Sequence, residues 1–207
     1  MRTDRPDSRD PDDLPPPLPL RGHAEDDLRF IRTAIERAGA FTSISGWGQV
    51  AVGVTALAAA AIAPADCRQD RWVAIWLGEA LVAAAISVWS AVLKSQRLGV
   101  PLFGAPAQRF TLAFATPAAA GAVLTAALVR AHAYPLLPGM WLLLYGAAVA
   151  SGGAFSVGCV PAMGACFMVL GAAAALTPAA WANTWLALGF GLVHVVFGAW
   201  IARRHGG

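Results

Sequence analysis

Three polar side chains stand inside long apolar runs of this sequence, where they could do chemistry: Glu79, Ser87 and His194. A charged side chain at the centre of a membrane helix costs at least about 2.5–3.5 kcal/mol on insertion scales, so it needs a partner or a function. A carboxyl group there can bind a proton, a cation or a small ligand, and an imidazole can relay a proton. We therefore take these residues as candidates for a ligand or proton site.

Helical geometry predicts that these side chains face other helices. Glu79 shares a face with Ala83 and Ser87, and the opposite face is apolar, as expected for a helix with one side in lipid. The face of His194 is built from small residues: Ala187, Gly191 and Gly198. Two interpretations stay open for both Glu79 and His194, namely packing through hydrogen bonds between helices and a functional site. The expected span ends put Glu79 nearer the outer side and His194 nearer the inner side, which argues against direct contact.

The sequence gives little support to metal, cofactor or enzyme chemistry. His194 is the only histidine inside an expected span, and no second ligand stands at metal-binding spacing, so we expect no metal and no cofactor. Ser151 beside Gly152, followed later by His194, invites comparison with rhomboid-type intramembrane proteases. The G-x-S-G motif of those proteases is absent here. We expect a non-enzymatic protein and keep an intramembrane enzyme as the third alternative.

The composition points to lipid as the surrounding solvent. Of the 207 residues, 57% are hydrophobic and only 13% are charged, whereas a soluble domain carries roughly 25% charged residues. Nine of the 12 acidic residues lie within residues 1–36, and Glu79 is the only one after residue 70. This distribution excludes a soluble enzyme, a secreted disulfide scaffold and a disordered protein.

The chain before the first apolar run divides into two segments. Residues 1–22 are rich in proline, arginine and aspartate, which predicts a disordered tail. Residues 23–43 are predicted to hold a cytoplasmic amphipathic helix over 24–41, with Leu28, Ile31 and Ile35 at helical spacing among charged residues. This helix could lie on the membrane surface, or its apolar face could dock a protein partner or a second copy of the chain.

The rest of the chain predicts an all-α polytopic membrane helix bundle. A span needs about 20 apolar residues, and residues 44–201 offer six such runs separated by proline, glycine or basic residues. A basic C-terminal tail, residues 202–207, follows the last run. The expected transmembrane helices are 44–63, 72–93, 110–129, 138–156, 160–177 and 181–201. The fourth and fifth are separated only by a weak turn signal.

Basic residues set the expected orientation, because cytoplasmic loops are enriched in lysine and arginine. With six spans, 12 of the 15 basic residues fall on the side of the termini and three fall on the other side. We therefore expect both termini in the cytoplasm. The lipid bilayer is the expected partner, and nucleic acid is not, since no basic stripe interleaved with aromatic residues is present.

Several short motifs resemble those of an uncharacterised family of bacterial six-helix integral membrane proteins. They include WLGEA at 76–80 and SGGAFSV at 151–157, and the remaining matching stretches are 36–42, 46–48, 138–146, 161–164, 189–198 and 203–207. The resemblance covers roughly residues 28–207 and implies a multi-pass protein of the bacterial cytoplasmic (inner) membrane. The family's genes often lie beside those of winged-helix regulators, which implies a sensing or signalling role. It implies no catalytic residue.

These observations lead to one functional expectation and two alternatives. We expect a sensor or partner-binding membrane component without catalytic activity, with a small ligand near Glu79 and His194. The first alternative is a proton-coupled or small-solute transporter that uses Glu79. An intramembrane enzyme is the other.

Overall fold

A computed structural model describes residues 31, 44–63, 68–99 and 104–205. The chain forms two units, residues 1–38 and 39–207. Of the first unit only Ile31 is described, as a helical residue with a half-exposed side chain. The predicted tail 1–22, most of the predicted helix 23–43, and the candidate residues Leu28 and Ile35 lie outside the described residues.

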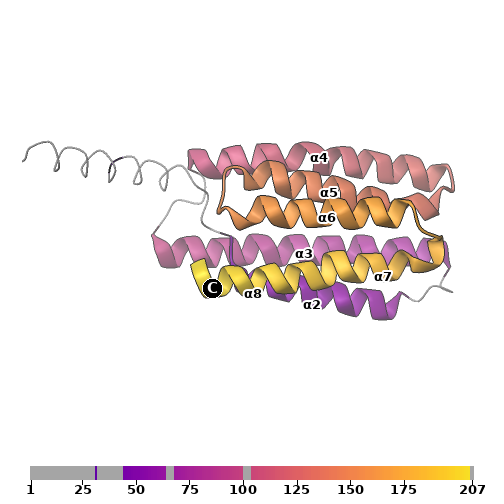
Figure 1. The fold of residues 1–207 in the computed structure, drawn as a ribbon, viewed down its shortest axis with the longest axis horizontal. Helices are drawn as coiled ribbons and strands as arrows, with labels where there is room; N and C mark the ends of the chain where they lie inside the picture. Colours follow the sequence, from indigo (N-terminus) through magenta and orange to yellow (C-terminus); the bar gives the residue numbers. More distant parts are fainter. Residues whose placement is uncertain (1–30, 32–43, 64–67, 100–103, 206–207) are drawn as a thin grey trace, which may run out of the picture. The chain divides into compact units, whose positions relative to one another are not determined.

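The described part of the second unit is built from helices, which confirms the all-α prediction (Figure 1). Each of the six predicted apolar segments is helical. The helices are α2 (Gly46–Ile62), α3 (Gln69–Leu98), α4 (Ala105–Arg130), α5 (Leu137–Gly153, preceded by the 3₁₀ turn Tyr134–Leu136), α6 (Cys159–Ala175), and a last helical stretch that consists of a 3₁₀ turn (Ala179–Trp181), α7 (Ala182–Leu186), the π-helical segment η4 (Ala187–Val193) and α8 (His194–His205).

Helix ends depart from the predicted spans where polar residues extend a helix or glycines end it. The helix α3 begins three residues before the predicted span 72–93 and continues five residues past it, because Lys94 and Arg97 are compatible with helix although not with hydrocarbon. The predicted span 138–156 is too long, since α5 ends at Gly153. Residues 154–158 then form the reversal into α6 that the sequence signalled only weakly.

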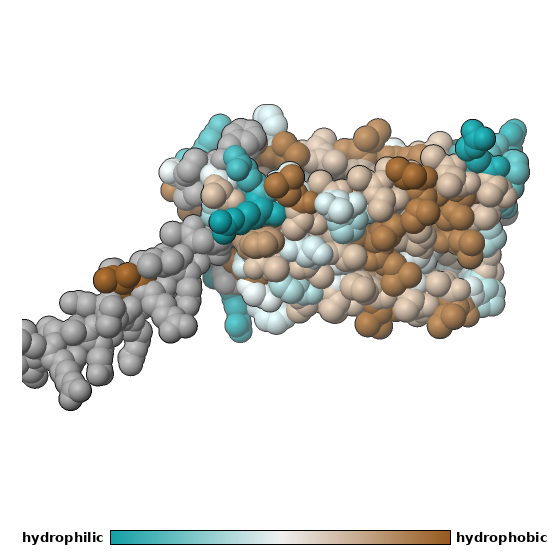
Figure 2. Space-filling view, turned by 90° about the horizontal axis from the view of Figure 1, so that it is seen from above, coloured by the Kyte–Doolittle hydropathy of each residue, from teal (hydrophilic) through white to brown (hydrophobic). Residues whose placement is uncertain are grey.

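In the part of the chain that the structure describes, four helical stretches are long and apolar enough to cross a membrane: Gln69–Leu98, Ala105–Arg130, Tyr134–Gly153 and Ala179–Arg204. This supports the prediction of a membrane protein. The apolar helices α2 and α6 have 17 residues each, about 26 Å at 1.5 Å per residue, slightly less than a hydrocarbon core of about 30 Å. Seen from above in Figure 2, hydrophilic residues gather at the two ends of the bundle, and apolar residues cover much of the surface between them.

The helices of this unit form two layers (Figure 1). In one layer α2 packs between α3 and the η4–α8 stretch, and in the other α5 packs between α4 and α6. The layers meet mainly where α6 and α5 contact the last helical stretch, through η4 and α7. Phe167, Leu142 and Leu186 are fully buried at this junction.

Glycines bring the helices within each layer into backbone contact. A Cβ atom at Gly198 of α8 would lie 2.7 Å from the Val50 backbone nitrogen and 2.8 Å from the Gly46 carbonyl oxygen of α2. A Cβ atom at Gly164 of α6 would lie 2.5 Å from the backbone nitrogen of Ala150 in α5. Small residues at helix interfaces in membranes allow such close approach. Because lipid provides little hydrophobic driving force for helix association, van der Waals packing at these contacts stabilises the interface instead.

We predict that Gly198→Ala lowers the free energy of unfolding by about 1–3 kcal/mol, because the added methyl group overpacks the α2–α8 interface. Gly78 of α3 is the matched control, since a Cβ atom there meets nothing within 4 Å. Gly78→Ala is expected to be neutral or to stabilise by up to about 1 kcal/mol through helix propensity. Thermal or denaturant unfolding of the purified protein in detergent measures both variants, and equal effects would contradict the tight packing.

Candidate functional site: an intramembrane cavity

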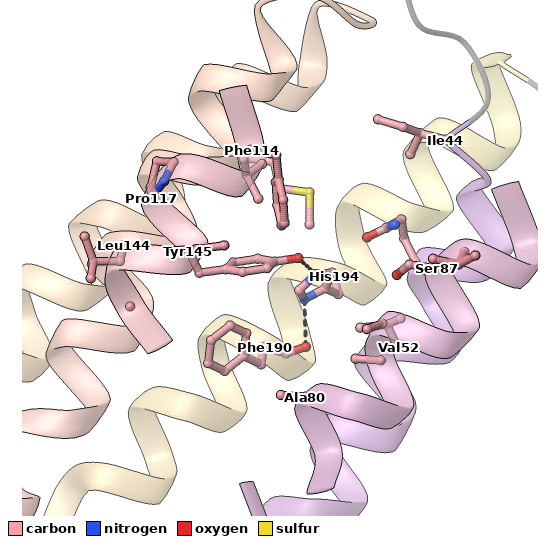
Figure 3. Close-up of a pocket in the computed structure, with 18 of the residues that line it drawn as sticks. Ile44, Val52, Ala80, Ser87, Phe114, Pro117, Leu144, Tyr145, Phe190 and His194 are labelled. Atoms are coloured by element: carbon pink, nitrogen blue, oxygen red, sulfur yellow. Dashed lines mark hydrogen bonds between the residues drawn. The ribbon is translucent and has the colours of Figure 1, made fainter. Parts of the chain in front are cut away.

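A cavity of about 1000 Å³ lies between the two layers (Figure 3). Its described lining is mainly apolar, with alanines on α3 and α4 and aromatic rings on α4 and α5. The three candidate residues Glu79, Ser87 and His194 all line it. The structure thus brings to one cavity the residues that the sequence singled out, although their role as a site stays a prediction.

His194 is buried and both of its ring nitrogens are engaged. Its Nδ1 lies 2.9 Å from the Phe190 carbonyl oxygen, and its Nε2 lies 2.9 Å from the Tyr145 hydroxyl oxygen. A carbonyl oxygen only accepts, so Nδ1 donates its proton, and in the neutral imidazole Nε2 accepts the hydrogen bond from Tyr145. Figure 3 shows this chain of two hydrogen bonds from α5 through His194 to the π-helical segment.

Aromatic rings hold the Tyr145–His194 pair in place. The Tyr145 ring meets the rings of Phe114 and Phe167 nearly at right angles, at centroid distances of 5.9 and 4.9 Å. The His194 ring packs edge to face on Phe167 at 5.1 Å. Edge-to-face pairs add about 0.5–1.5 kcal/mol beyond their buried area. The pair therefore connects the two layers through both hydrogen bonds and ring contacts.

The π-helical segment η4 immediately precedes His194 and was not predicted. Seven residues, Ala187–Val193, adopt it, and π-helical turns inside α-helices are rare and frequent at functional sites. A Cβ atom at Gly189 would lie 2.4 Å from the Leu142 side chain, so the widened turn passes very close to α5. The sequence signal for this segment was the pair of glycines flanking Phe190.

Glu79 is held by a threonine of the neighbouring helix. The Thr55 hydroxyl lies 2.9 Å from Glu79 Oε1 and 2.9 Å from the Val52 carbonyl oxygen. A carboxylate accepts the Thr55 proton, whereas a carboxylic acid can donate to Thr55 while Thr55 donates to Val52. Both protonation states of Glu79 fit this geometry. Thr55 is a residue that the sequence analysis missed.

Glu79 and His194 lie at more similar depths than the predicted span ends suggested. Gly53 is two residues from Thr55, and a Cβ atom there would lie 2.6 Å from the Gly191 carbonyl oxygen and 2.7 Å from the Val195 side chain. Those two residues flank His194. The π-helical segment before His194 and the greater length of α3 change the relative depths of His194 and Glu79 from those that the predicted span ends implied. Glu79 bonds to Thr55, and His194 bonds to Tyr145 and Phe190, so no hydrogen bond joins these two described residues.

Tryptophan side chains lie at one end of the cavity, and their indole N–H groups donate hydrogen bonds to other side chains. The Trp72 and Trp76 indoles donate to Asn183 Oδ1 over 2.7 and 3.2 Å, and the Asn183 amide donates to the Ala63 carbonyl oxygen. The Trp141 indole donates to Thr125 Oγ1 over 2.8 Å. These partners satisfy polar groups that would otherwise be costly in hydrocarbon.

Within the described ranges, no group of three or more His, Cys, Asp or Glu side chains could hold a metal ion. Glu79 and His194 alone would give two ligands, and both His194 nitrogens already have protein partners. Three protein ligands is the usual minimum for a zinc site.

Comparison with known proteins adds neither a family nor a fold to this description. No family model, curated protein or solved structure matches the chain. The cavity geometry therefore carries the functional argument.

We predict that Tyr145→Phe lowers the free energy of unfolding by about 0.5–1.5 kcal/mol, because the buried His194 Nε2 loses its donor. Tyr134→Phe is the control, since Tyr134 donates to the exposed Asp70 over 3.3 Å and water can replace that bond. The control is expected to change stability by less than about 0.5 kcal/mol. Chemical unfolding in detergent compares the two, and equal losses would contradict a special role for the Tyr145–His194 pair.

Proposed function

We propose that this protein is a non-enzymatic sensor or partner-binding component of a bacterial cytoplasmic membrane, and that it binds a small ligand in the cavity between its two layers. The observation that carries the proposal is the cavity itself, of about 1000 Å³, which is at the upper end of the range of ligand pockets. It places a carboxyl group, Glu79, and a hydrogen-bonded histidine, His194, among apolar walls. The bacterial location rests on the family resemblance of the sequence.

The helix pattern supports six spans with both termini in the cytoplasm. Although α2 and α6 are short, α2 packs along the longer α3, and α6 packs along α5, which forms a stretch of 20 residues with its 3₁₀ turn, so thinning or tilting accommodates the small mismatch. The helices alternate in direction and bring the start of α2 and the end of α8 to one side. Among the described basic residues that side carries Lys94, Arg97, Arg109, Arg203 and Arg204, and the other side carries Arg68, Arg71 and Arg130. This bias agrees with cytoplasmic termini.

The state of His194 favours binding over catalysis. A general base needs a free nitrogen within reach of the reacting proton, whereas both nitrogens of His194 contact Tyr145 and Phe190. Tyr145 is the partner of His194 Nε2, and the serine and threonine side chains of the described lining make no hydrogen bond to His194 or Glu79. Ser87, the nearest candidate by type, has no hydrogen bond to a histidine.

The partner-binding part of the proposal places the contact on residues 23–43. We predict that deletion of 23–43 from the full-length tagged protein abolishes recovery of its partner, or of a second copy, after cross-linking in membranes. Deletion of 1–22 is the matched control and is expected to leave recovery unchanged, because that tail lacks apolar residues at helical spacing. Unchanged recovery after deletion of 23–43 would contradict a partner-binding role and would leave only a membrane-surface role for this segment.

A proton-coupled or small-solute transporter is the second candidate, and the length of the cavity favours it. Lining residues on α4 run from Ala107 to Thr125, about 27 Å of helix at 1.5 Å per residue. Such a cavity covers most of the depth of a hydrocarbon core.

A flux assay in proteoliposomes separates the sensor from the transporter. We predict no proton or solute flux above protein-free vesicles, and no change in Glu79→Gln. Asp70→Asn is the matched carboxyl-to-amide control, because Asp70 is exposed at the end of α3. Flux that is lost in Glu79→Gln and kept in Asp70→Asn would establish the transporter instead.

A further inference from the structure

The cavity opens sideways between α3 and α4. In the described chain α3 packs mainly on α2, and α4 packs mainly on α5, so these two helices border the cavity without closing it. Val88 of α3 and Leu112 of α4 both line the cavity, yet 64% and 70% of their surface is exposed. Both residues lie in helices long and apolar enough to cross a membrane. The opening therefore faces hydrocarbon, and a ligand that enters there must be soluble in lipid.

The cavity is elongated along the helices. On α3 its lining residues run from Trp76 to Ala91, about 22 Å of helix, and the run on α4 is slightly longer. Because its volume of about 1000 Å³ is spread over this length, the cavity is a narrow channel parallel to the membrane normal. A chain-like molecule fits this shape, whereas a compact polycyclic molecule would fill only part of it.

Polar groups without partners line the cavity from Glu79 to the end where α2 and α4 begin. Among the described residues, Gln49, Ser87 and Thr111 line the cavity, and none of their side chains makes a hydrogen bond. The second carboxyl oxygen of Glu79, Oε2, is also without a partner, because its one hydrogen bond uses Oε1. Glu79 lies three residues from Trp76, which is at the opposite end of the α3 lining, and the other three lie toward the end where α2 and α4 begin. Unpaired polar groups in a membrane interior are costly, so a ligand that pairs with them gains affinity.

The end of the cavity beyond Glu79 is apolar, or its polar groups already have partners. Thr125 is the polar side chain at this end, and it donates to the Gly121 carbonyl oxygen while it accepts from the Trp141 indole. Leu77 and Ala122 complete the wall with Trp76. This end offers no partner to a polar group and suits an apolar tail.

The charged residues of the lining determine which net charge a bound ligand can carry. Neither lysine nor arginine is among the lining residues that the structure describes, and Glu79 is their one acidic residue. A phosphate or carboxylate head would lie near Glu79 without a cation, and like charges in a medium of low dielectric repel strongly. The Gln49 amide and the two hydroxyl groups both donate and accept hydrogen bonds, whereas ionised Glu79 Oε2 only accepts, so a hydrogen-bond donor can pair with all four groups.

We propose that the cavity takes up, from within the bilayer, a single-chain amphiphile whose polar group donates hydrogen bonds and carries no negative charge, such as a long-chain amine or alcohol. The polar group lies between Glu79 and Ser87, and the tail runs past Ala118 and Ala122. This inference rests on the proposed function and names the ligand class of the same cavity.

Photo-cross-linking in nanodiscs tests the proposal with the full-length protein. The probe is a long-chain amine that carries a diazirine at the end of its tail, and mass spectrometry locates the labelled residues. We expect labels at the apolar end of the cavity, around Ala122 and Leu144, which an excess of unlabelled amine or alcohol removes. The carboxylic acid of equal chain length is expected to compete about tenfold less well, a difference of about 1.4 kcal/mol.

Cavity-filling variants distinguish the cavity from the lipid-facing surface. Ala118→Trp on α4 and Ala84→Trp on α3 place an indole in the cavity and are expected to abolish the competed label. Ala120→Trp and Ala85→Trp are the matched controls, since both alanines are exposed on the same helices and lie outside the lining. Two independent pairs keep the test decisive if one variant fails to fold.

Three results would overturn the inference. Labels spread over exposed residues such as Leu81 and Val169, without competition, would show ordinary annular lipid. Equal competition by the carboxylic acid would refute the ligand class. The proposed function would still be supported if a molecule of another class binds the cavity and Ala118→Trp prevents its binding. Cross-links between Val88 of one copy and Leu112 of another would show that a second copy fills the opening. If no competitor reduces the labelling, the result would count against the proposed function as well.

Discussion

Backbone contact between helices, made possible by glycine, is the constraint on which the rest of this structure depends. In lipid the apolar surface of a helix gains little by leaving its solvent, so association depends on close packing and on hydrogen bonds between helices. Gly46 and Gly198 supply such packing between α2 and α8, and Gly146 and Gly164 supply it between α5 and α6. Each layer is therefore tight within itself. The layers contact each other over a narrower region, through η4, and a cavity remains where α3 and α4 do not meet.

The second constraint is that polar groups inside a membrane must find partners in the protein. Most of the described ones do, through short chains such as Tyr145 to His194 to the Phe190 carbonyl oxygen. Asn183 satisfies two indoles at one end of the bundle. Against this background the unpaired oxygen of Glu79 stands out, because the same structure shows how readily a neighbouring hydroxyl or amide could have satisfied it. This contrast is the physical basis for a ligand at that place.

A binding site of this kind connects the two regions that the sequence marked as unusual. A ligand between α3 and α4 would change how these helices are spaced, and α3 also packs on α2, the first helix after the charged segment 23–43. In the proposed function, α3 would connect occupancy of the cavity to α2, the helix that follows the partner-binding segment in the sequence. A conformational response requires only that the ligand bind one spacing of α3 and α4 better than another.

The sequence by itself determined the solvent, the helices and the unusual residues. Hydrophobic runs of about 20 residues predicted where six helices lie, and the rarity of charge after residue 70 singled out Glu79. These are local properties, since each run has to satisfy its own backbone hydrogen bonds in lipid. The tertiary structure alone decided which side chains meet. Thr55 reaches Glu79 from 24 residues away and Tyr145 reaches His194 from 49 residues away, and neither pair leaves a periodic signal. The π-helical segment and the gap between α3 and α4 likewise arise from how glycines of separate helices pack, which no single run of sequence contains.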